Sequence, residues 1–237
     1  MRHQDLIEIG QSADLHSFES SLVRLAGALD FSLVNAALVV DQPGQEPLFL
    51  GVGNTPREYA NSFSDASDSR RDPVLRQLKK LSVPVIYDQK TYIEGNAADL
   101  WEHQARFGYH TGVAVALHLP NNRHFVLGVD RRDPLSQDER EVTRLMGDLQ
   151  LLAVHAQDAA LRLLTREQPQ VQEDLSLTPR ELEVLKLTME GLTAAAIADR
   201  VAISVPTVNF HLRNLREKLG AHSKHQAVLR ALSLGLL

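Results

Sequence analysis

The sequence predicts an α/β domain, an α-β-α sandwich with a central antiparallel sheet, followed by an all-α domain of four helices. Three observations predict this order. Short β-branched runs alternate with helical periodicity as far as residue 164. A polar stretch interrupted by Pro169 follows, and four helix-start signals come after it. We therefore expect domains at residues 1–165 and 177–237, joined by a linker at 166–176.

Charge is distributed unevenly along the chain. The 237 residues carry a formal net charge of −5. Residues 177–237 hold eight Lys and Arg against five Asp and Glu, a net charge of +3, which leaves −8 for the first 176 residues. Because nucleic acid is a polyanion, the positive C-terminal part is the candidate for binding it.

Composition excludes several classes of protein. There is no cysteine, so disulfides, thiol catalysis and thiolate zinc sites are excluded, and a reducing cytosol is expected. No apolar run approaches the ~20 residues that span a bilayer. The first residues also lack the basic-then-apolar pattern of a secretory signal. We therefore expect a cytoplasmic protein with no membrane partner.

The elements of the first domain follow from apolar periodicity. Residues 14–29 carry apolar side chains at the spacing of an amphipathic helix. Short apolar runs bounded by turn residues predict strands, of which the last two form a hairpin. The expected strands cover residues 32–40, 49–52, 83–87, 112–119 and 124–129.

A long helix is expected to close the first domain. Ser136-x-x-Glu139 has the pattern of a capping box, and an apolar stripe then runs from Val142 to Leu163. A helix striped to its end packs on more than one neighbour. Two interpretations remain open at this point: a dimer interface, or a core helix that spans its own domain.

Start and stop signals define the second domain. Thr178-Pro179-Arg180-Glu181 is a capping box with proline at the first helical position. Thr193 and Ser204 are expected to cap the second and third helices, and a capping box from Ser223 to Gln226 is expected to open the fourth. Gly191 and Gly220 are placed to end helices.

The second and third helices form a predicted helix-turn-helix. They are short, joined by a tight turn, and the second of the pair is basic on its free face. Asn pairs with adenine and Arg with guanine in the major groove, while Thr and Lys suit phosphates. The expected DNA-binding residues are Ser204, Thr207, Asn209, His211, Arg213, Arg216, Lys218 and Lys224. On spacing alone, a solvated face on an ordinary four-helix bundle remains an alternative.

The second domain closely resembles the LuxR-type DNA-binding domain. The resemblance runs from Leu177 through Thr178-Pro179-Arg180-Glu181 to Thr207-Val208-x-x-His211-x-x-Asn214-x-x-x-Lys218-Leu219. It implies that the third helix enters the major groove and that the fourth helps the domain to dimerise. A two-fold DNA site is then expected, with half-sites about one helical turn (~34 Å) apart.

The first domain offers two sensor classes. A phospho-receiver needs an acidic pair after its first strand, whereas here only Asp41 follows that strand and a helix precedes it. The alternative rests on Tyr59-x-x-x-Phe63, Asp72-Pro73, Tyr87 and Gly112. This spacing resembles the autoinducer-binding domain of quorum-sensing LuxR-type regulators, whose pattern is Trp, Tyr, Asp-Pro, Trp and Gly.

That resemblance implies a site for an N-acyl homoserine lactone. Asp72 would accept the amide N–H of the ligand, and Tyr59 would retain a donor for the lactone carbonyl. Phe63 lacks the hydroxyl that family members offer, and Gly128 falls about where many relatives carry Ser or Thr. Each aromatic residue could instead serve packing alone. The implied ligand-binding residues are Tyr59, Phe63, Asp72, Val74, Tyr87, Trp101, Gly112 and Gly128.

We therefore expect a ligand-responsive transcription regulator of the quorum-sensing LuxR type. Its departures at the polar end of the site favour a lactone held by fewer hydrogen bonds, or another signal bearing an amide or a hydroxyl. Expected partners are DNA, a second copy of the chain, the signal, and RNA polymerase if the protein is an activator. The alternative is a dimeric DNA-binding regulator that senses no ligand or a non-lactone one.

An enzyme is not expected. The sequence has no Gly-rich phosphate loop and no serine nucleophile elbow. Ten histidines are present, but His103, His110, His118 and His124 show no zinc-type pairing in the sequence. We therefore expect no catalytic residue, no metal and no cofactor.

Overall fold

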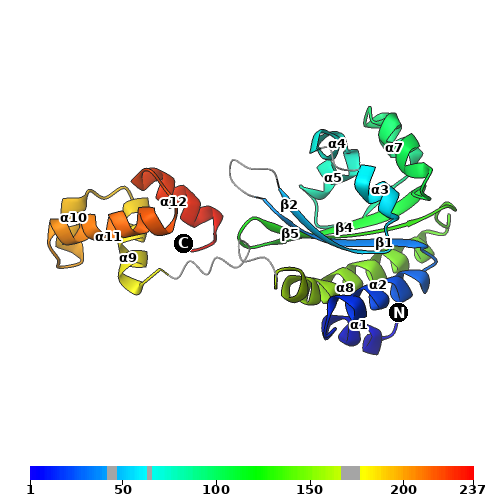
Figure 1. Ribbon diagram of the computed structural model, residues 1–237, viewed down its shortest axis with the longest axis horizontal. Helices are drawn as coiled ribbons and strands as arrows, with labels where there is room; N and C mark the ends of the chain where they lie inside the picture. The colour runs from blue at the N-terminus through cyan, green and yellow to red at the C-terminus, as the bar shows by residue number, and fades with distance from the viewer. Residues whose placement is uncertain (42–46, 63–65, 167–176) are drawn as a thin grey trace. The chain divides into compact units, whose positions relative to one another are not determined.

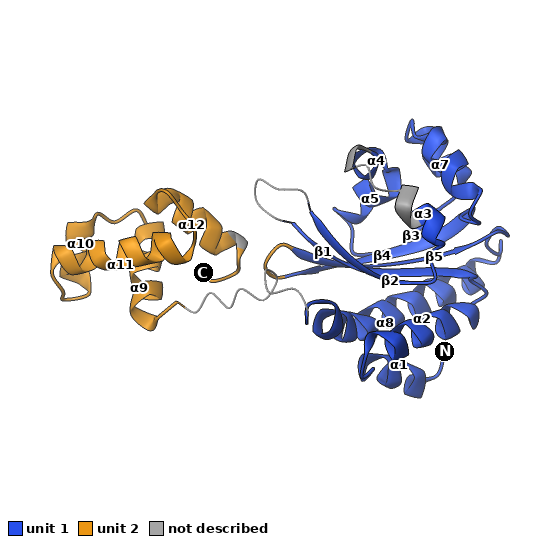
Figure 2. Ribbon diagram, in the orientation of Figure 1, with its two compact units in different colours: residues 1–119, 123–171 blue, residues 120–122, 172–237 orange. Residues whose placement is uncertain are grey.

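The fold is taken from a computed structural model that describes residues 1–41, 47–62, 66–166 and 177–237 (Figure 1). The chain divides into two compact units (Figure 2). Unit 1 comprises Met1–Leu119 and Arg123–Val171, and unit 2 comprises Pro120–Asn122 and Gln172–Leu237. The predicted turn after residue 41 and residues 167–176 of the predicted linker (166–176) lie outside the described residues.

A five-stranded antiparallel sheet lies at the centre of unit 1, in the order β2-β1-β5-β4-β3. Its strands are β1 (Leu33–Val40), β2 (Leu48–Gly53), β3 (Val85–Tyr87), β4 (Thr111–Leu119) and β5 (Arg123–Arg131). All five occur where the apolar runs predicted them. Asn121 and Asn122 take positive φ angles of 64° and 54° in the turn between β4 and β5, a conformation that Asn tolerates well.

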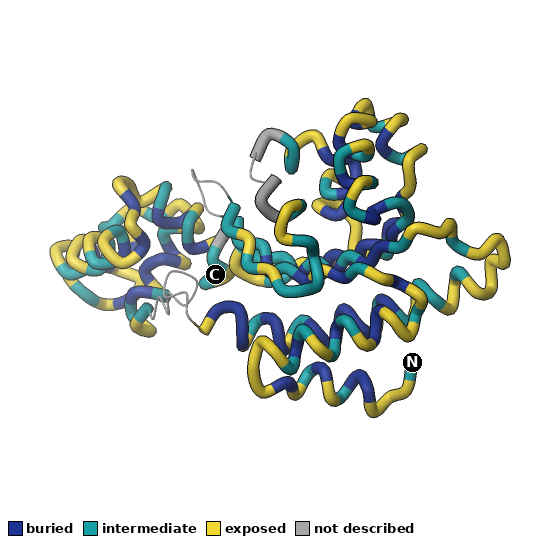
Figure 3. Tube along the Cα trace, turned by 45° about the vertical axis from the view of Figure 1, so that its right-hand side comes forward, coloured by how far each residue is buried: buried dark blue, intermediate teal, exposed yellow. Residues whose placement is uncertain are grey.

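Three helices cover one face of the sheet, as Figure 1 shows: α1 (His3–Gly10), α2 (Leu15–Gly27) and α8 (Glu139–Leu164). Phe18 and Leu22 of α2 and Leu152 of α8 pack there against Phe125 of β5. Figure 3 shows buried and exposed stretches alternating along α8, as its apolar stripe predicted. The sequence did not predict α1, because eight residues carry too little periodicity.

Five short helices lie on the other side of the sheet. They are α3 (Arg57–Ser62), α4 (Ala66–Arg71), α5 (Pro73–Leu78), α6 (Gln89–Glu94) and α7 (Ala98–Ala105). A second apolar cluster forms here, in which Val74, Leu78, Tyr92 and Leu100 pack against Ala114 of β4. The predicted α-β-α sandwich is therefore confirmed.

The predicted capping box of α8 is wrong. The N-cap is Asp138, whose carboxylate accepts a hydrogen bond from the Arg140 amide at 2.8 Å. Ser136 lies before the helix, and its hydroxyl accepts from the amide of Asp138 at 3.1 Å. The carboxylate is the better acceptor for the amides at a helix start, so the helix begins at Glu139.

Unit 2 contains α9 (Pro179–Met189), α10 (Ala194–Arg200), α11 (Val205–Lys218) and α12 (Lys224–Ser233). Its core joins Val184 of α9, Ile197 of α10 and Leu215 of α11. The caps occur where they were expected, and the Thr178 box is complete. The predicted box at the start of α12 is only half formed, because the Gln226 side chain accepts from the amide of His222 rather than Ser223.

The corrected cap of α8 can be tested by mutation. Asp138→Ala is expected to lower the free energy of unfolding by about 1 kcal/mol, because it removes the acceptor at the helix start. Ser136→Ala, two residues earlier, should change it by less than about 0.5 kcal/mol. Urea denaturation of both variants provides the measurement. A larger loss from Ser136→Ala would restore Ser136 as the cap.

Candidate functional site

Asp72 is buried at the start of α5, and all its hydrogen-bond partners come from unit 1. Pro73 is the first residue of α5, and its ring fixes the backbone φ angle there. Oδ1 of Asp72 accepts from the amides of Val74 at 2.7 Å and Leu75 at 2.9 Å. Oδ2 accepts from the Tyr92 hydroxyl at 3.1 Å. Burial raises the pKa of this carboxyl above its usual value, although all three hydrogen bonds act to lower it.

A second buried carboxyl, Asp130, lies at the end of β5. The Tyr87 hydroxyl donates to its Oδ2 at 2.8 Å. Gly112 of β4 pairs with both Tyr87 and Asp130 in the sheet. A Cβ added to Gly112 would lie 2.6 Å from Oδ1 of Asp130, and closer still to the Tyr87 ring. Only glycine therefore allows this contact across the strand.

Sequence reasoning missed Asp130, which looked like an ordinary polar residue at a strand end. Strand alternation was the available signal, because Gly128 and Asp130 share a face and oppose Ala114 and Gly112. Burial, with a smaller contribution from the charge of Asp72, raises the pKa of the Asp130 carboxyl to about 7, against the hydrogen bond from Tyr87. Its Oδ1 has no hydrogen-bond partner among the described residues.

All four tyrosines of the chain gather near these two carboxyls. The rings of Tyr59 and Tyr109 lie 4.5 Å apart, and those of Tyr87 and Tyr92 lie 6.4 Å apart. Burial, followed by the charges of nearby groups that include Asp130, raises the pKa of Tyr59 well above its usual value. The cluster therefore offers neutral hydroxyl groups beside two carboxyls.

The remaining predicted ligand-binding residues lie on the same side of the sheet. Val74 is buried in the second apolar cluster, and Trp101 packs against that cluster and donates to the His110 carbonyl at 3.4 Å. Gly128 faces open space, since a Cβ added there would meet nothing within 4 Å. The structure therefore brings together Tyr59, Asp72, Val74, Tyr87, Trp101, Gly112 and Gly128 in one layer. Phe63 lies outside the described residues.

In unit 2, α11 and its N-cap carry the predicted DNA-binding residues other than Lys224. Ser204 caps the helix by accepting from the Thr207 amide at 3.2 Å. Asn209 and Arg213 are exposed, while His211 is half-buried. The sequence analysis did not single out Phe210, which is also exposed and lies with its ring centre 5.4 Å from the Arg213 guanidinium. Its signal was a large apolar residue on the polar side of the helix.

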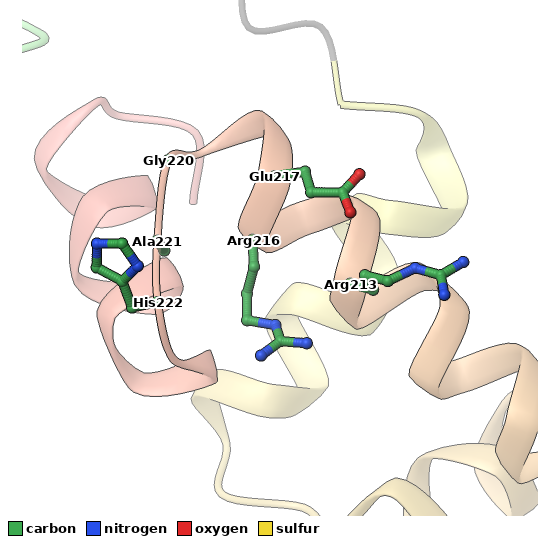
Figure 4. Close-up of a pocket in the computed structure, with 6 residues that line it drawn as sticks. All are labelled: Arg213, Arg216, Glu217, Gly220, Ala221 and His222. Carbon is green, nitrogen blue, oxygen red and sulfur yellow. The ribbon is translucent and has the colours of Figure 1, made fainter.

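A hollow of about 450 Å³ lies beside the C-terminal half of α11. Figure 4 shows Arg213 and Arg216 extending from the helix, with His222 in the segment that leads to α12. Glu217 supplies the carboxylate in its lining. The two guanidinium groups supply charged hydrogen-bond donors at this end of α11.

Lys218 differs from the other predicted DNA-binding residues. Its ammonium lies 2.7 Å from Oε2 of Glu181, the same oxygen that accepts from the Thr178 amide at the start of α9. The ion pair therefore ties the end of α11 to the start of α9. Lys224 is exposed in the first turn of α12. DNA contacts by both lysines stay predictions.

Two histidines that are six residues apart in the sequence lie side by side in the sheet. His118 and His124 oppose each other in the β4–β5 register, with their Nδ1 atoms 2.9 Å apart. Nε2 of His124 lies 3.1 Å from the Asp41 carboxylate. Among the described residues, no group of three His, Asp or Glu side chains is placed to hold a metal ion. The same residues contain no helix with the length and apolar character of a membrane span.

A helix-turn-helix unit joined in one chain to a separate α-β-α unit indicates the class of two-domain DNA-binding regulators. Comparison with family models agrees for both parts. Residues 14–160 match the autoinducer binding domain, and residues 175–231 match the bacterial regulatory proteins of the luxR family. The chain therefore belongs to the LuxR family of autoinducer-binding transcription regulators and is not an enzyme.

Individual relatives match almost the whole chain. The transcriptional activator protein SolR of Ralstonia nicotianae is 31% identical over 219 residues, which are 92% of this chain and 89% of SolR. A crystal structure of Escherichia coli SdiA superposes with a TM-score of 0.80 at 26% identity, covering 98% of this chain and 96% of SdiA. A structure of SdiA in complex with octanoyl-rac-glycerol gives a TM-score of 0.82 at 24% identity, covering 98% and 93%.

Two glycines in the sheet should respond differently to the same substitution. Gly112→Ala is expected to lower the free energy of unfolding by about 1–3 kcal/mol, because the methyl group meets Tyr87 and Asp130. Gly128→Ala is the matched control and should leave stability within about 0.5 kcal/mol, since its methyl enters open space. Chemical denaturation measures both. Equal effects would contradict the close approach at Gly112.

Proposed function

We propose that the protein binds an N-acyl homoserine lactone, or a related amide-bearing signal, between its sheet and α3–α7, and acts as a dimer on a two-fold promoter site. The observation that carries this proposal is the buried carboxyl of Asp72, which is 5% exposed. It lies on the side of the sheet where Gly128 faces open space. Its Oδ2 accepts one hydrogen bond and has capacity for another. A ligand amide N–H is a suitable donor.

The surrounding residues supply the rest of a ligand site. A small-molecule site needs mostly apolar walls and a few polar groups that fix orientation. Tyr87, Trp101 and Val74 provide the walls in this proposal, and Tyr59 provides a hydroxyl donor in place of an indole. Losing one neutral hydrogen bond relative to the family pattern costs only about 0.5–1.5 kcal/mol, so a lactone remains compatible with the site.

Exposed apolar residues support dimerisation of both units. Leu151 and Val154 are 50% and 47% exposed on α8, one helical turn apart, opposite the buried alanines of that helix. Leu229 and Leu232 are similarly exposed on α12. Pairs of apolar residues at this spacing suit helix–helix contact between two copies. The dimer would present two copies of α11 to half-sites about one helical turn (~34 Å) apart.

The proposed setting follows from the DNA target. A regulator of bacterial promoters works in the cytoplasm, and as an activator it would also contact RNA polymerase. Direct base contacts are assigned to Asn209 and Arg213, which are exposed on α11. Phosphate contacts are assigned to Ser204, Thr207, His211, Arg216, Lys218 and Lys224.

Ligand binding is tested by thermal unfolding with a panel of N-acyl homoserine lactones. At a hundredfold excess over Kd, a ligand that binds only the folded form stabilises it by ~2.7 kcal/mol, which should raise the melting temperature by roughly 5–10 °C. Asp72→Asn should abolish the shift, because the amide keeps the cap of α5 but replaces an acceptor with a donor. Asp88→Asn, at the cap of α6, is the control and should retain it.

Two outcomes would contradict the proposal. A shift that survives Asp72→Asn would remove Asp72 from the ligand site. A folded wild-type protein that no lactone stabilises would favour a regulator that senses no lactone.

DNA recognition is tested by binding to a promoter fragment at fixed salt. Arg213→Ala should weaken specific binding by about 1–3 kcal/mol and relax base preference, as expected for a side chain that reads a base. Lys186→Ala, an exposed lysine of α9 outside this face, is the control and should change affinity little. Unaltered affinity and discrimination in Arg213→Ala would show that another face of unit 2 reads the DNA.

A further inference from the structure

Oδ1 of Asp130 is a buried polar atom without a hydrogen-bond partner among the described residues. The side chain is 3% exposed, and its other oxygen already accepts from Tyr87. An unpaired buried oxygen costs free energy, and folded proteins rarely retain one without a reason. A ligand group that completes this hydrogen bond would supply the reason.

Open space lies near Asp130, on the face of the sheet that Asp130 shares with Gly128. Gly128 lies two residues before Asp130 on β5, or about 7 Å along the strand. Nothing lies within 4 Å of a Cβ built on Gly128, and Asn35, its partner on β1, is exposed. Oδ1 itself has almost no exposed area in this structure, so a ligand head that enters from the side of Gly128 reaches it only after neighbouring side chains shift.

The groups around Asp130 favour its neutral form. The titratable groups that act on it are Tyr87 of β3 and Asp72 at the start of α5, and Asp130 in turn acts on Tyr59 of α3 and on Tyr109. None of these is a cation. Arg131, the next residue, donates instead to the carbonyls of Asp133 and Pro134. A buried carboxyl near another acid and without a cation keeps its proton most readily.

We propose that Asp130 determines ligand specificity: the O–H of its protonated Oδ1 donates a hydrogen bond to a carbonyl oxygen of the ligand head, while Asp72 accepts from the ligand N–H. Tyr87 is a positioning residue, because its hydroxyl holds Oδ2 and leaves Oδ1 for the ligand. The inference rests on the proposed function and narrows the ligand class. The site selects an acyl amide whose head carries a second carbonyl, such as a lactone, over a head that offers only hydroxyl groups.

This arrangement makes ligand affinity depend on pH, with a defined sign. The neutral acid donates and the ionised one cannot, so affinity is highest below the pKa of Asp130 and falls as pH rises above it. With that pKa at about 7, affinity should fall about tenfold between pH 6 and pH 8. Calorimetric titration of the full chain with N-octanoyl-homoserine lactone at these two values is the measurement.

Two variants isolate Asp130 from Asp72, which is also a buried acid. Asp130→Asn donates through its amide at every pH, so its affinity at pH 6 should stay within about threefold of wild type and change less than twofold by pH 8. Tyr87→Phe removes the hydrogen bond that lowers the pKa of Asp130, so the fall in affinity should move to higher pH. A tenfold fall that persists in Asp130→Asn would overturn the inference, because another group would then be titrating.

N-octanoyl-ethanolamine is the contrasting probe, since it keeps the amide N–H and its head offers a hydroxyl group in place of the lactone carbonyl. Weaker binding than the lactone at pH 6 supports the assigned selectivity. Binding that tightens as pH rises would mean that ionised Asp130 accepts a hydroxyl, and it would overturn the inference.

Failure of the proposed function gives a separate result. If no lactone binds the wild type, the ligand assignment is wrong. The protonation of Asp130 is then tested by measuring unfolding without ligand at several pH values. A buried acid whose pKa is raised by folding contributes stability at low pH that is lost as pH rises toward 7. The unfolding stability of the wild type relative to Asp130→Asn should then fall between pH 5 and 7.5. A flat difference would overturn the inference.

Discussion

The two faces of β5 are the constraint on which the sensor unit depends. Phe125, Leu127 and Val129 point into the core formed with α1, α2 and α8. The alternate residues, including Gly128 and Asp130, face the layer of α3–α7. A slip of one residue would bury the carboxyl against α8 and turn the apolar side chains toward α3–α7. Pairing with β1 and β4 on both sides prevents that slip, so one strand fixes both the core and the site.

Much of the fold could be predicted from the sequence, because its signals are local. The strands contain β-branched runs, and the helices of unit 2 are capped by Thr178, Thr193, Ser204 and Ser223, whose side chains accept from amides three residues further on. Helices α3–α7 have six to eight residues and carry too few apolar repeats to be recognised. The start of α8 was misplaced because Ser136 and Asp138 are both capable caps, and only the chain geometry decides between them.

The candidate site could be predicted only in part. Asp72 and Gly112 were found through resemblance to a family, and their physical roles became apparent in the structure: one carboxyl caps a helix, and one glycine admits a tyrosine. Asp130 was missed because its partner Tyr87 lies 43 residues away in the sequence. Contacts of that kind depend on strand register, and a single sequence without its pairing does not reveal them.

The positions of the aromatic residues give the protein a built-in optical reporter. Its one tryptophan and all four tyrosines lie in the sensor unit, and residues 177–237 contain neither. Trp101 packs against the cluster that includes Tyr87 and Tyr92. Tryptophan and tyrosine emission from the intact chain therefore arises in the unit that holds the two buried carboxyls, and the helix-turn-helix contributes none of it. Events at the sensor can be followed by fluorescence in the presence of unlabelled DNA.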